Sequence, residues 1–255
     1  MVEERPNYGS PTAHIAANFM VGILLLTLAL VGYFLLSPLL VLLLLPSVYF
    51  FWSARGWARG GLLRDKLRIR DDFISVVGVE DGERILDVGT GSGFLAIGFA
   101  KRMTYGEVVG IDVWIPLGGG TSMRNVLRNA EVEGVSDRVS FKRADARDIP
   151  YPDDYFDRVV ASFTIHIIRG WEKAVEEMVR VLKPGGVFAV LEPGRGWAGG
   201  WKVDQDLRRK LEGLGLRNVT FKPFTVYYPK KRDVYLIMGV KGESQADRLS
   251  PSLSL

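Results

Sequence analysis

Three glycines follow a short apolar run near the middle of the chain: Gly89, Gly91 and Gly93 in the segment ILDVGTGSGFLAIG. Glycine has no Cβ, so a glycine turn between a strand and a helix lets a ligand lie against the backbone. The dinucleotide fingerprint GxGxxG would place its third small residue at Phe94, and that bulk argues against a pyrophosphate close to the helix. Asp87, just before the loop, would repel a phosphate and favour a cationic ligand.

Acidic residues end the next two apolar runs. Asp112 in VVGIDVW comes about twenty residues after the last glycine, where an acid can bind the hydroxyls of a ribose. Asp145 in RVSFKRADARD ends the following run and could accept a hydrogen bond from an adenine amino group. Trp114 is placed to cover an adenine face. Each feature alone is weak, but together and in this order they predict a nucleoside-type ligand at one edge of a sheet.

The elements that must position these residues follow from the alternation of short apolar runs with helical patterns. We expect strands at 83–89, 108–114, 138–145, 158–168, 186–193, 218–228 and 233–241, and helices at 94–103, 121–134, 171–182 and 204–215. Buried strands alternating with helices are typical of a doubly wound α/β fold with a mostly parallel sheet. The last two strands follow each other without a helix, which predicts a hairpin and one antiparallel strand in a seven-stranded sheet.

With these residues in this order, the chain from about residue 70 to 240 resembles the class I S-adenosylmethionine-dependent methyltransferases. The acid followed by GxGxG, the ribose acid and the adenine-contacting acid of that family match the residues described above, and the stretches FDRVVASFTIHI and VLKPGGVFAVLEP are similar to its later strands. The resemblance implies a Rossmann-like methyltransferase fold, S-adenosylmethionine as cofactor and a methyl-transferring enzyme. The cofactor-binding residues expected from residues and resemblance together are Asp87, Gly89, Thr90, Gly91, Gly93, Asp112, Val113, Trp114, Asp145, Ala146 and Ser162.

Candidates for the chemistry lie at the carboxyl ends of the later strands, where such sheets bind ligands. His166 in SFTIHII is the only histidine of this region and is the candidate catalytic base, with a structural or acceptor-positioning role as the alternative. Glu192 can be an internal hydrogen-bond partner or a group at the acceptor. The loop GRGWAGGW could cap a hydrophobic acceptor, rest on a bilayer surface or be a plain surface loop. The predicted acceptor-binding residues are Glu192, Arg195, Trp197 and Tyr227.

Composition excludes several other functions. The chain of 255 residues has no cysteine, so disulfides, thiolate metal sites and cysteine nucleophiles are absent. It has only two histidines, His14 and His166, and we predict no metal site. The net charge of +4 without a long basic run argues against nucleic acid as the main partner.

The first fifth of the chain is different. No Asp, Glu, Lys or Arg occurs between Arg5 and Arg55, and the apolar part covers residues 15–52, about 38 residues where one helical crossing needs about 20. Proline at position 38 interrupts a helix, so we expect two helices, about 14–36 and 39–54, in a transmembrane hairpin. The second is short and contains Pro46, so it could enter the bilayer without crossing it.

Other interpretations of this segment fit less well. A signal peptide has an apolar core of about 7–15 residues after a basic start, whereas this segment is far longer and follows Glu3 and Glu4. A pair of buried core helices would show a polar face, which runs such as LVLLLL lack. The basic residues Arg55, Arg59, Arg64, Lys66, Arg68 and Arg70 follow the hairpin and predict that the next domain is cytoplasmic, with a collar facing anionic lipid headgroups.

The predicted organisation has five parts: a polar segment (1–13), a membrane-anchoring hairpin (14–54), a basic amphipathic linker and helix (55–80), a methyltransferase domain (81–241) and a disordered tail (242–255). The function expected is a membrane-anchored methyltransferase whose acceptor is a membrane-associated lipid headgroup or isoprenoid-type molecule. A methyltransferase of membrane proteins and a non-catalytic cofactor-binding scaffold are the alternatives. The sequence makes no prediction of the acceptor atom or of the oligomeric state.

Overall fold

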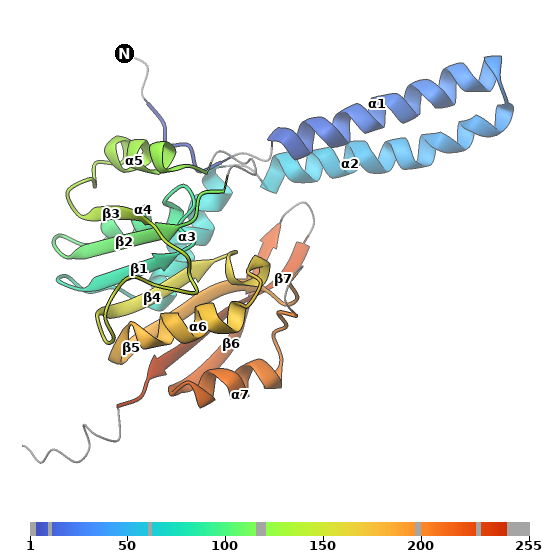
Figure 1. Cartoon of the computed structure of the whole chain (residues 1–255). Coiled ribbons are helices and arrows are strands. Elements are labelled where there is room, and N and C mark those ends of the chain that lie inside the picture. Colours follow the sequence, from blue (N-terminus) through green and yellow to red (C-terminus); the bar gives the residue numbers. More distant parts are fainter. Residues whose placement is uncertain are drawn as a thin grey trace, which may run out of the picture.

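The structure is a computed structural model, and it describes residues 4–9, 12–60, 63–115, 121–196, 200–227 and 231–243. A helical hairpin projects as one long arm from an α/β body (Figure 1). The predicted tail falls mostly on residues 244–255, which lie outside the described part.

The body is built on one sheet of seven strands in the order β3-β2-β1-β4-β5-β7-β6. The strands are β1 (Arg84–Val88), β2 (Glu107–Asp112), β3 (Val139–Arg143), β4 (Phe156–Ser162), β5 (Leu182–Pro193), β6 (Leu216–Tyr227) and β7 (Lys231–Lys241). The first five are parallel, and β7 runs antiparallel to both β5 and β6. The mostly parallel α/β sheet and its closing hairpin are therefore confirmed.

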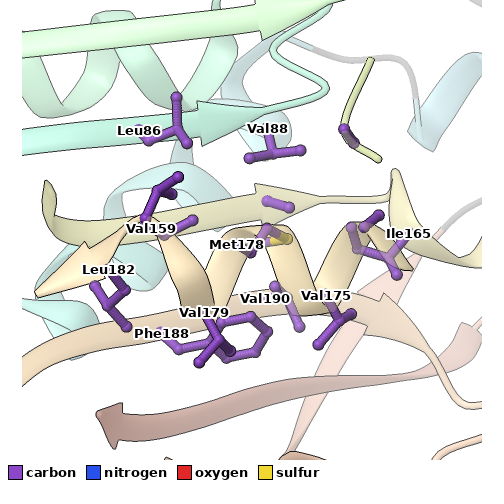
Figure 2. Close-up of a cluster of buried hydrophobic side chains, with 14 of the residues drawn as sticks. Leu86, Val88, Val159, Ile165, Val175, Met178, Val179, Leu182, Phe188 and Val190 are labelled. Atoms are coloured by element: carbon purple, nitrogen blue, oxygen red, sulfur yellow. The ribbon is translucent and has the colours of Figure 1, made fainter. Parts of the chain in front are cut away.

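Alternate residues of a central strand point to opposite faces of the sheet, and apolar residues on both faces are buried under helices. Ile85 belongs to the hydrophobic core between the sheet and the helices α3 (Leu63–Val77), α4 (Phe94–Ala100) and α5 (Met123–Val132). Leu86 contacts the core under α6 (Trp171–Arg180) and α7 (Gln205–Gly213), which is drawn close up in Figure 2. Both residues are fully buried.

The predicted strand 158–168 ends earlier than its apolar pattern indicates. Strand β4 stops at Ser162, Phe163 turns the chain with a φ of 53°, and a 3-10 helix covers Ile165–Ile167. A left-handed backbone is rare for a bulky residue and is typical of functional sites. The break lies at the carboxyl edge of the sheet, beside the glycine loop.

The arm consists of α1 (Thr12–Leu35), a 3-10 helix (Pro38–Leu43) and α2 (Leu44–Gly60). Pro46 sits in the first turn of α2, where a missing N–H breaks no helical bond. The predicted second helix, 39–54, begins as the 3-10 helix and continues as α2 to Gly60. Helix α1 packs closely on the 3-10 helix at Gly32, where an added Cβ would clash with Leu40 Cδ1. Within the described residues, His14–Leu35 and Pro38–Ala58 are long and apolar enough to cross a membrane, and only 17% of the most apolar part of each is buried.

Both ends of the arm are fastened to the body. Tyr8, just before α1, is buried against Phe94 and donates a hydrogen bond to Glu133 Oε1 (3.0 Å). Lys66 Nζ on α3, the helix that follows the arm, donates to the carbonyl oxygens of Tyr8 (3.4 Å) and Gly9 (2.8 Å). The sequence had indicated no role for the polar segment before the hairpin.

The predicted basic collar is only partly exposed. Arg64 and Arg68 are exposed, with side chains 91% and 83% accessible. Arg70 is 7% exposed and lies over the ring of Phe94, so it packs within the body and not toward a lipid surface. Lys66 likewise faces the body, and the side chain of Arg59 lies outside the described part.

Candidate active site

The glycine loop joins β1 to α4, and its three glycines have left-handed backbones with φ of 71°, 54° and 81° for Gly89, Gly91 and Gly93. A Cβ at Gly89 would lie 2.1 Å from Thr164 Cγ2, and one at Gly93 would lie 2.7 Å from Val126 Cγ2. At Gly91 the nearest atom would be 3.5 Å away. The loop is therefore held tightly at both ends and open at its middle, where a ligand can approach the backbone.

Asp87 supports the loop from inside. It is 2% exposed, and its Oδ2 accepts hydrogen bonds from Thr90 Oγ1 (2.7 Å) and the Ala96 N–H (3.0 Å). Burial raises the pKa of the Asp87 carboxyl to about 7. The sequence interpretation placed this carboxylate beside the ligand, whereas the structure turns it, together with the buried Thr90, toward the loop and the start of α4.

Asp112 at the end of β2 fastens the loop on the other side. Its Oδ2 accepts the Gly91 N–H (2.9 Å) and its Oδ1 accepts the Trp114 N–H (2.7 Å). A carboxylate has about four acceptor positions, so half of them remain for a ligand. The side chain is only partly buried, which leaves it accessible beside the open middle of the loop.

Trp114 is part of the loop structure. Its indole N–H donates to the Gly91 carbonyl (2.8 Å), its backbone φ is 43°, and it is 4% exposed. The contact with an adenine face therefore stays a prediction. Val113 beside it is 39% exposed.

Asp145 follows β3 and is paired with Arg147, whose Nη2 lies 2.6 Å from its Oδ2. Hydrogen bonding to Arg147 lowers the pKa of the Asp145 carboxyl, which keeps it an acceptor at neutral pH. Its side chain is 40% exposed. Ala146 next to it is 9% exposed, and Ser162 at the end of β4 is half-buried.

His166 and Glu192 meet at the ends of β4 and β5. His166 Nδ1 lies 2.6 Å from Glu192 Oε2, and the His166 side chain is 12% exposed. Glu192 Oε1 accepts the backbone N–H groups of Thr164 and Ile165, both at 2.8 Å. Glu192 is 0% exposed, which favours the alternative of an internal hydrogen-bond partner, here of His166; its contact with an acceptor stays a prediction.

Two residues that sequence reasoning missed complete this region. Thr164 Oγ1 lies within hydrogen-bond distance of the carbonyl oxygens of Ser162 (3.1 Å) and Gly89 (3.3 Å), so it joins the His166 segment to the glycine loop. Phe163 is 41% exposed and, with Ile167 at 59%, places apolar surface on either side of His166 in the chain. The positive φ of Phe163 is invisible in an apolar run, so no signal in the sequence marked it.

The GRGWAGGW loop does not cap the site with Trp201. That side chain is 3% exposed, forms an edge-to-face pair with Trp171 at 5.0 Å and donates its indole N–H to the Pro193 carbonyl (2.9 Å). Arg195 is exposed, and its backbone pairs with Lys202. Trp197 and the side chain of Tyr227 lie outside the described residues, so their predicted roles stay untested.

No group of three or more His, Asp or Glu side chains that could hold a metal ion occurs in the part of the chain that the structure describes.

These elements are similar to those of a known protein family. Residues 86–190 match a family described as a methyltransferase domain. By this match the chain carries a methyltransferase domain over residues 86–190. The match begins at β1 and ends within β5, so it includes the glycine loop, Asp112, Asp145 and the 3-10 helix that carries His166.

Several relatives in sequence and solved structures of similar fold are also methyltransferases by name. The ubiquinone/menaquinone biosynthesis C-methyltransferase UbiE of Pseudomonas aeruginosa is 40% identical over 121 residues, 47% of this chain and 45% of that one. The chain thus spans about half the length of the curated relatives it matches. The crystal structure of an S-adenosylmethionine-dependent methyltransferase from Aquifex aeolicus has a TM-score of 0.55 at 23% identity and covers 74% of this chain and 98% of its own.

Phosphoethanolamine N-methyltransferase 2 of Haemonchus contortus, solved with S-adenosyl-L-methionine, has a TM-score of 0.57 at 16% identity and covers 72% of this chain and 53% of its own. At these identities the likeness shows the fold alone. It confirms the Rossmann-like fold of the methyltransferase domain.

The residues of the methyltransferase domain fit its cofactor class. The open backbone at Gly91 gives room for a ligand beside the loop, and Asp112 offers free acceptor positions for ribose hydroxyls. Asp145 offers an exposed, ionised acceptor at the next strand end. The fold brings these three predicted residues to one edge of the sheet.

Proposed function

We propose that the protein transfers a methyl group from S-adenosylmethionine to a lipophilic acceptor held in the membrane, with an isoprenoid-type ring as the first candidate. The observation that carries this proposal is the exposed apolar arm fastened at both ends to the domain with the glycine loop. Side chains such as Phe34, Leu36 and Leu45 on the arm are 81%, 80% and 75% exposed. Apolar surface on this scale marks a membrane or protein contact.

Partial identity to UbiE proteins supports the choice of acceptor. Those proteins are named for C-methylation in ubiquinone and menaquinone biosynthesis, and the matching 121 residues are 40% identical. Phe163 and Ile167 add exposed apolar surface next to His166, which suits an apolar acceptor. For a charged lipid headgroup as acceptor, we would expect charged side chains in place of this apolar surface.

The anchor explains how such an acceptor is reached. Strand β6 runs parallel to β5, so its end lies at the same edge of the sheet as the candidate site, and this strand contacts α2 of the arm. An acceptor confined to the bilayer would then be concentrated near the site. Exposed Arg55, Arg64 and Arg68 beside the arm favour a cytoplasmic position for the domain.

The chemistry divides between cofactor and chain. S-adenosylmethionine, when bound, supplies a methyl group on a positively charged sulfur. Gly91, Asp112 and Asp145 would hold it, and the chain then has to align the acceptor with the methyl group. His166 is the group that would take a proton from the acceptor.

The test is a transfer assay with the full chain reconstituted in native lipid extract and S-adenosylmethionine labelled in its methyl group. The label should appear in the neutral isoprenoid fraction and be lost with Asp112→Ala. Label in phospholipid headgroups or in membrane proteins would instead identify one of the other acceptor classes. Cofactor binding without any transfer would favour a non-catalytic scaffold.

A further inference from the structure

Glu192 is the most enclosed ionisable group at the site. Its side chain is 0% exposed, and two backbone N–H groups and one imidazole nitrogen from a single short segment lie within hydrogen-bond distance of it. Oε1 accepts from the backbone of Thr164 and Ile165, and Oε2 lies 2.6 Å from His166 Nδ1. If Glu192 is a carboxylate, both of its oxygens are acceptors, and Nδ1 is then the donor in this contact.

We propose that Glu192 is a positioning residue that keeps the proton of His166 on Nδ1 and so leaves Nε2 as a proton acceptor toward the methyl acceptor. This inference rests on the proposed function and adds to it the residue that prepares the base. The hydrogen bond at one imidazole nitrogen determines the role of the other.

The surroundings hold the backbone that carries His166 in place. Gly196 of the next loop approaches so closely that a Cβ there would lie 2.6 Å from the His166 carbonyl oxygen and 3.1 Å from His166 Cβ. The segment is also tied to the glycine loop through Thr164, whose Oγ1 is 3.3 Å from the Gly89 carbonyl. The segment that carries His166 and the glycine loop are therefore in direct contact.

The reaction balances with these groups. The O–H bond of an acceptor hydroxyl breaks, and its proton passes to His166 Nε2 while the electron pair stays on the acceptor. That pair, on the oxygen or delocalised to a ring carbon, forms a bond to the methyl carbon as the carbon–sulfur bond breaks and its pair goes to sulfur. The imidazolium lies against the Glu192 carboxylate until its proton leaves to solvent, so one proton is released for each methyl transferred. If the methyl group goes to a ring carbon, that carbon then loses its hydrogen as a proton and the oxygen takes up a proton to regain the hydroxyl, which leaves the net release at one proton.

Glu192→Gln tests the inference. The amide oxygen can still accept from Thr164 and Ile165, but its NH₂ would face Nδ1, which must then be an acceptor with the proton on Nε2. Nitrogen NMR of the imidazole reports this directly, measured at a pH where the ring is neutral. The chain has two histidines, so His166→Gln assigns the signals and His14 is an internal reference.

Glu177→Gln is the matched control. Glu177 is also buried, accepts the Ile149 N–H (3.0 Å) and pairs with Arg180, but it lies on α6 away from the histidine. We expect Glu192→Gln to move the proton to Nε2 and to lower kcat by about 100-fold or more, with the KM for S-adenosylmethionine nearly unchanged. Glu177→Gln should leave the tautomer and kcat as they are.

A wild-type ring with its proton on Nε2 would overturn the inference even if the variant fails to fold. So would a Glu192→Gln protein with wild-type kcat. Failure of the proposed function has a different signature, because a wild-type protein that binds no S-adenosylmethionine can still show the Nδ1 proton.

Discussion

Gly89 and Gly91 share a left-handed backbone but have different surroundings, which allows their roles to be separated. Alanine at either position adds roughly 1 kcal/mol of backbone strain. Only at Gly89 would the new Cβ also clash with Thr164. We expect Gly89→Ala to lower the thermal unfolding midpoint strongly, whereas Gly91→Ala folds with a small loss and binds S-adenosylmethionine more weakly. Equal unfolding midpoints for the two variants would contradict this assignment.

Asp87 should make the stability of the domain depend on pH. Burial raises its pKa from 3.8 to about 7, with the nearby Asp112 as a smaller cause. Between these values the folded chain retains a proton that the unfolded chain has lost, so stability falls as the pH rises. The loss is complete above the folded pKa and is on the order of 4 kcal/mol at most.

Asp87→Asn mimics the neutral carboxyl and removes this dependence. Denaturant unfolding at pH 4 and at pH 8 should show the variant gaining stability relative to wild type at the higher pH. A difference between the two proteins that is the same at both pH values would show that Asp87 stays ionised in the folded state.

At the residue scale, spacing predicted the glycine loop and the acids after β2 and β3, because ligand contacts in this fold fall at fixed strand ends. The same reasoning left open whether the GRGWAGGW loop caps the site and whether Glu192 is an internal partner or meets the acceptor, and in the structure both Trp201 and Glu192 are buried. Trp201 packs on Trp171, thirty positions away in the chain, and a one-dimensional pattern carries no information on that contact.

At the element scale, the segment before α1 (residues 4–9, called the strap) is linked to the glycine loop by hydrogen bonds. Asn129 on α5 is 1% exposed; its Oδ1 accepts the Asn7 N–H (2.8 Å), and its Nδ2 donates to the carbonyl oxygens of Asn7 and Ser92, both at 2.9 Å. Because Ser92 belongs to the loop, the strap and the cofactor site share one buried side chain.

Asn129→Ala should therefore weaken both folding and cofactor binding. Leaving buried backbone groups without partners costs about 1–3 kcal/mol each. Asn125→Ala, which removes donors to Asn7 and Ser92 at a half-exposed position, should have the smaller effect. Denaturant unfolding and calorimetry with S-adenosylmethionine measure the two effects, and an Asn129→Ala protein with wild-type affinity would exclude the coupling.

Periodicity predicted the order and type of the elements, since each central strand is an apolar run and each helix has one apolar face. It failed where a distant side chain redirects the backbone. The run after Ser162 is as apolar as a strand, yet the N–H groups of Thr164 and Ile165 bond to Glu192 and not to a neighbouring strand. The early end of β4 thus depends on a residue nearly thirty positions later.

At the scale of the whole molecule, both ends of the arm lie on the body, so the protein is expected to cross the membrane twice. Helix α1 has 24 residues, about 36 Å in length, and the hydrocarbon core is about 30 Å thick. The tip of the arm would then emerge on the side opposite the domain.

The absence of native cysteine makes this topology testable with single-cysteine variants. Leu36→Cys, at the exposed tip of the arm, should react with a membrane-impermeant maleimide added outside intact cells. Ser136→Cys, exposed on the body, should react only after permeabilisation. Labelling of both from the same side, or protection of the tip under both conditions, would contradict two crossings.

We propose that the glycine loop and Asp112 form the cofactor site of a membrane-anchored enzyme. Calorimetric titration of the full-length, detergent-solubilised protein with S-adenosylmethionine, alongside Asp112→Ala, measures cofactor binding at this site. We expect low-micromolar binding by the wild type and its loss in the variant. A folded wild-type protein that binds no S-adenosylmethionine would contradict it.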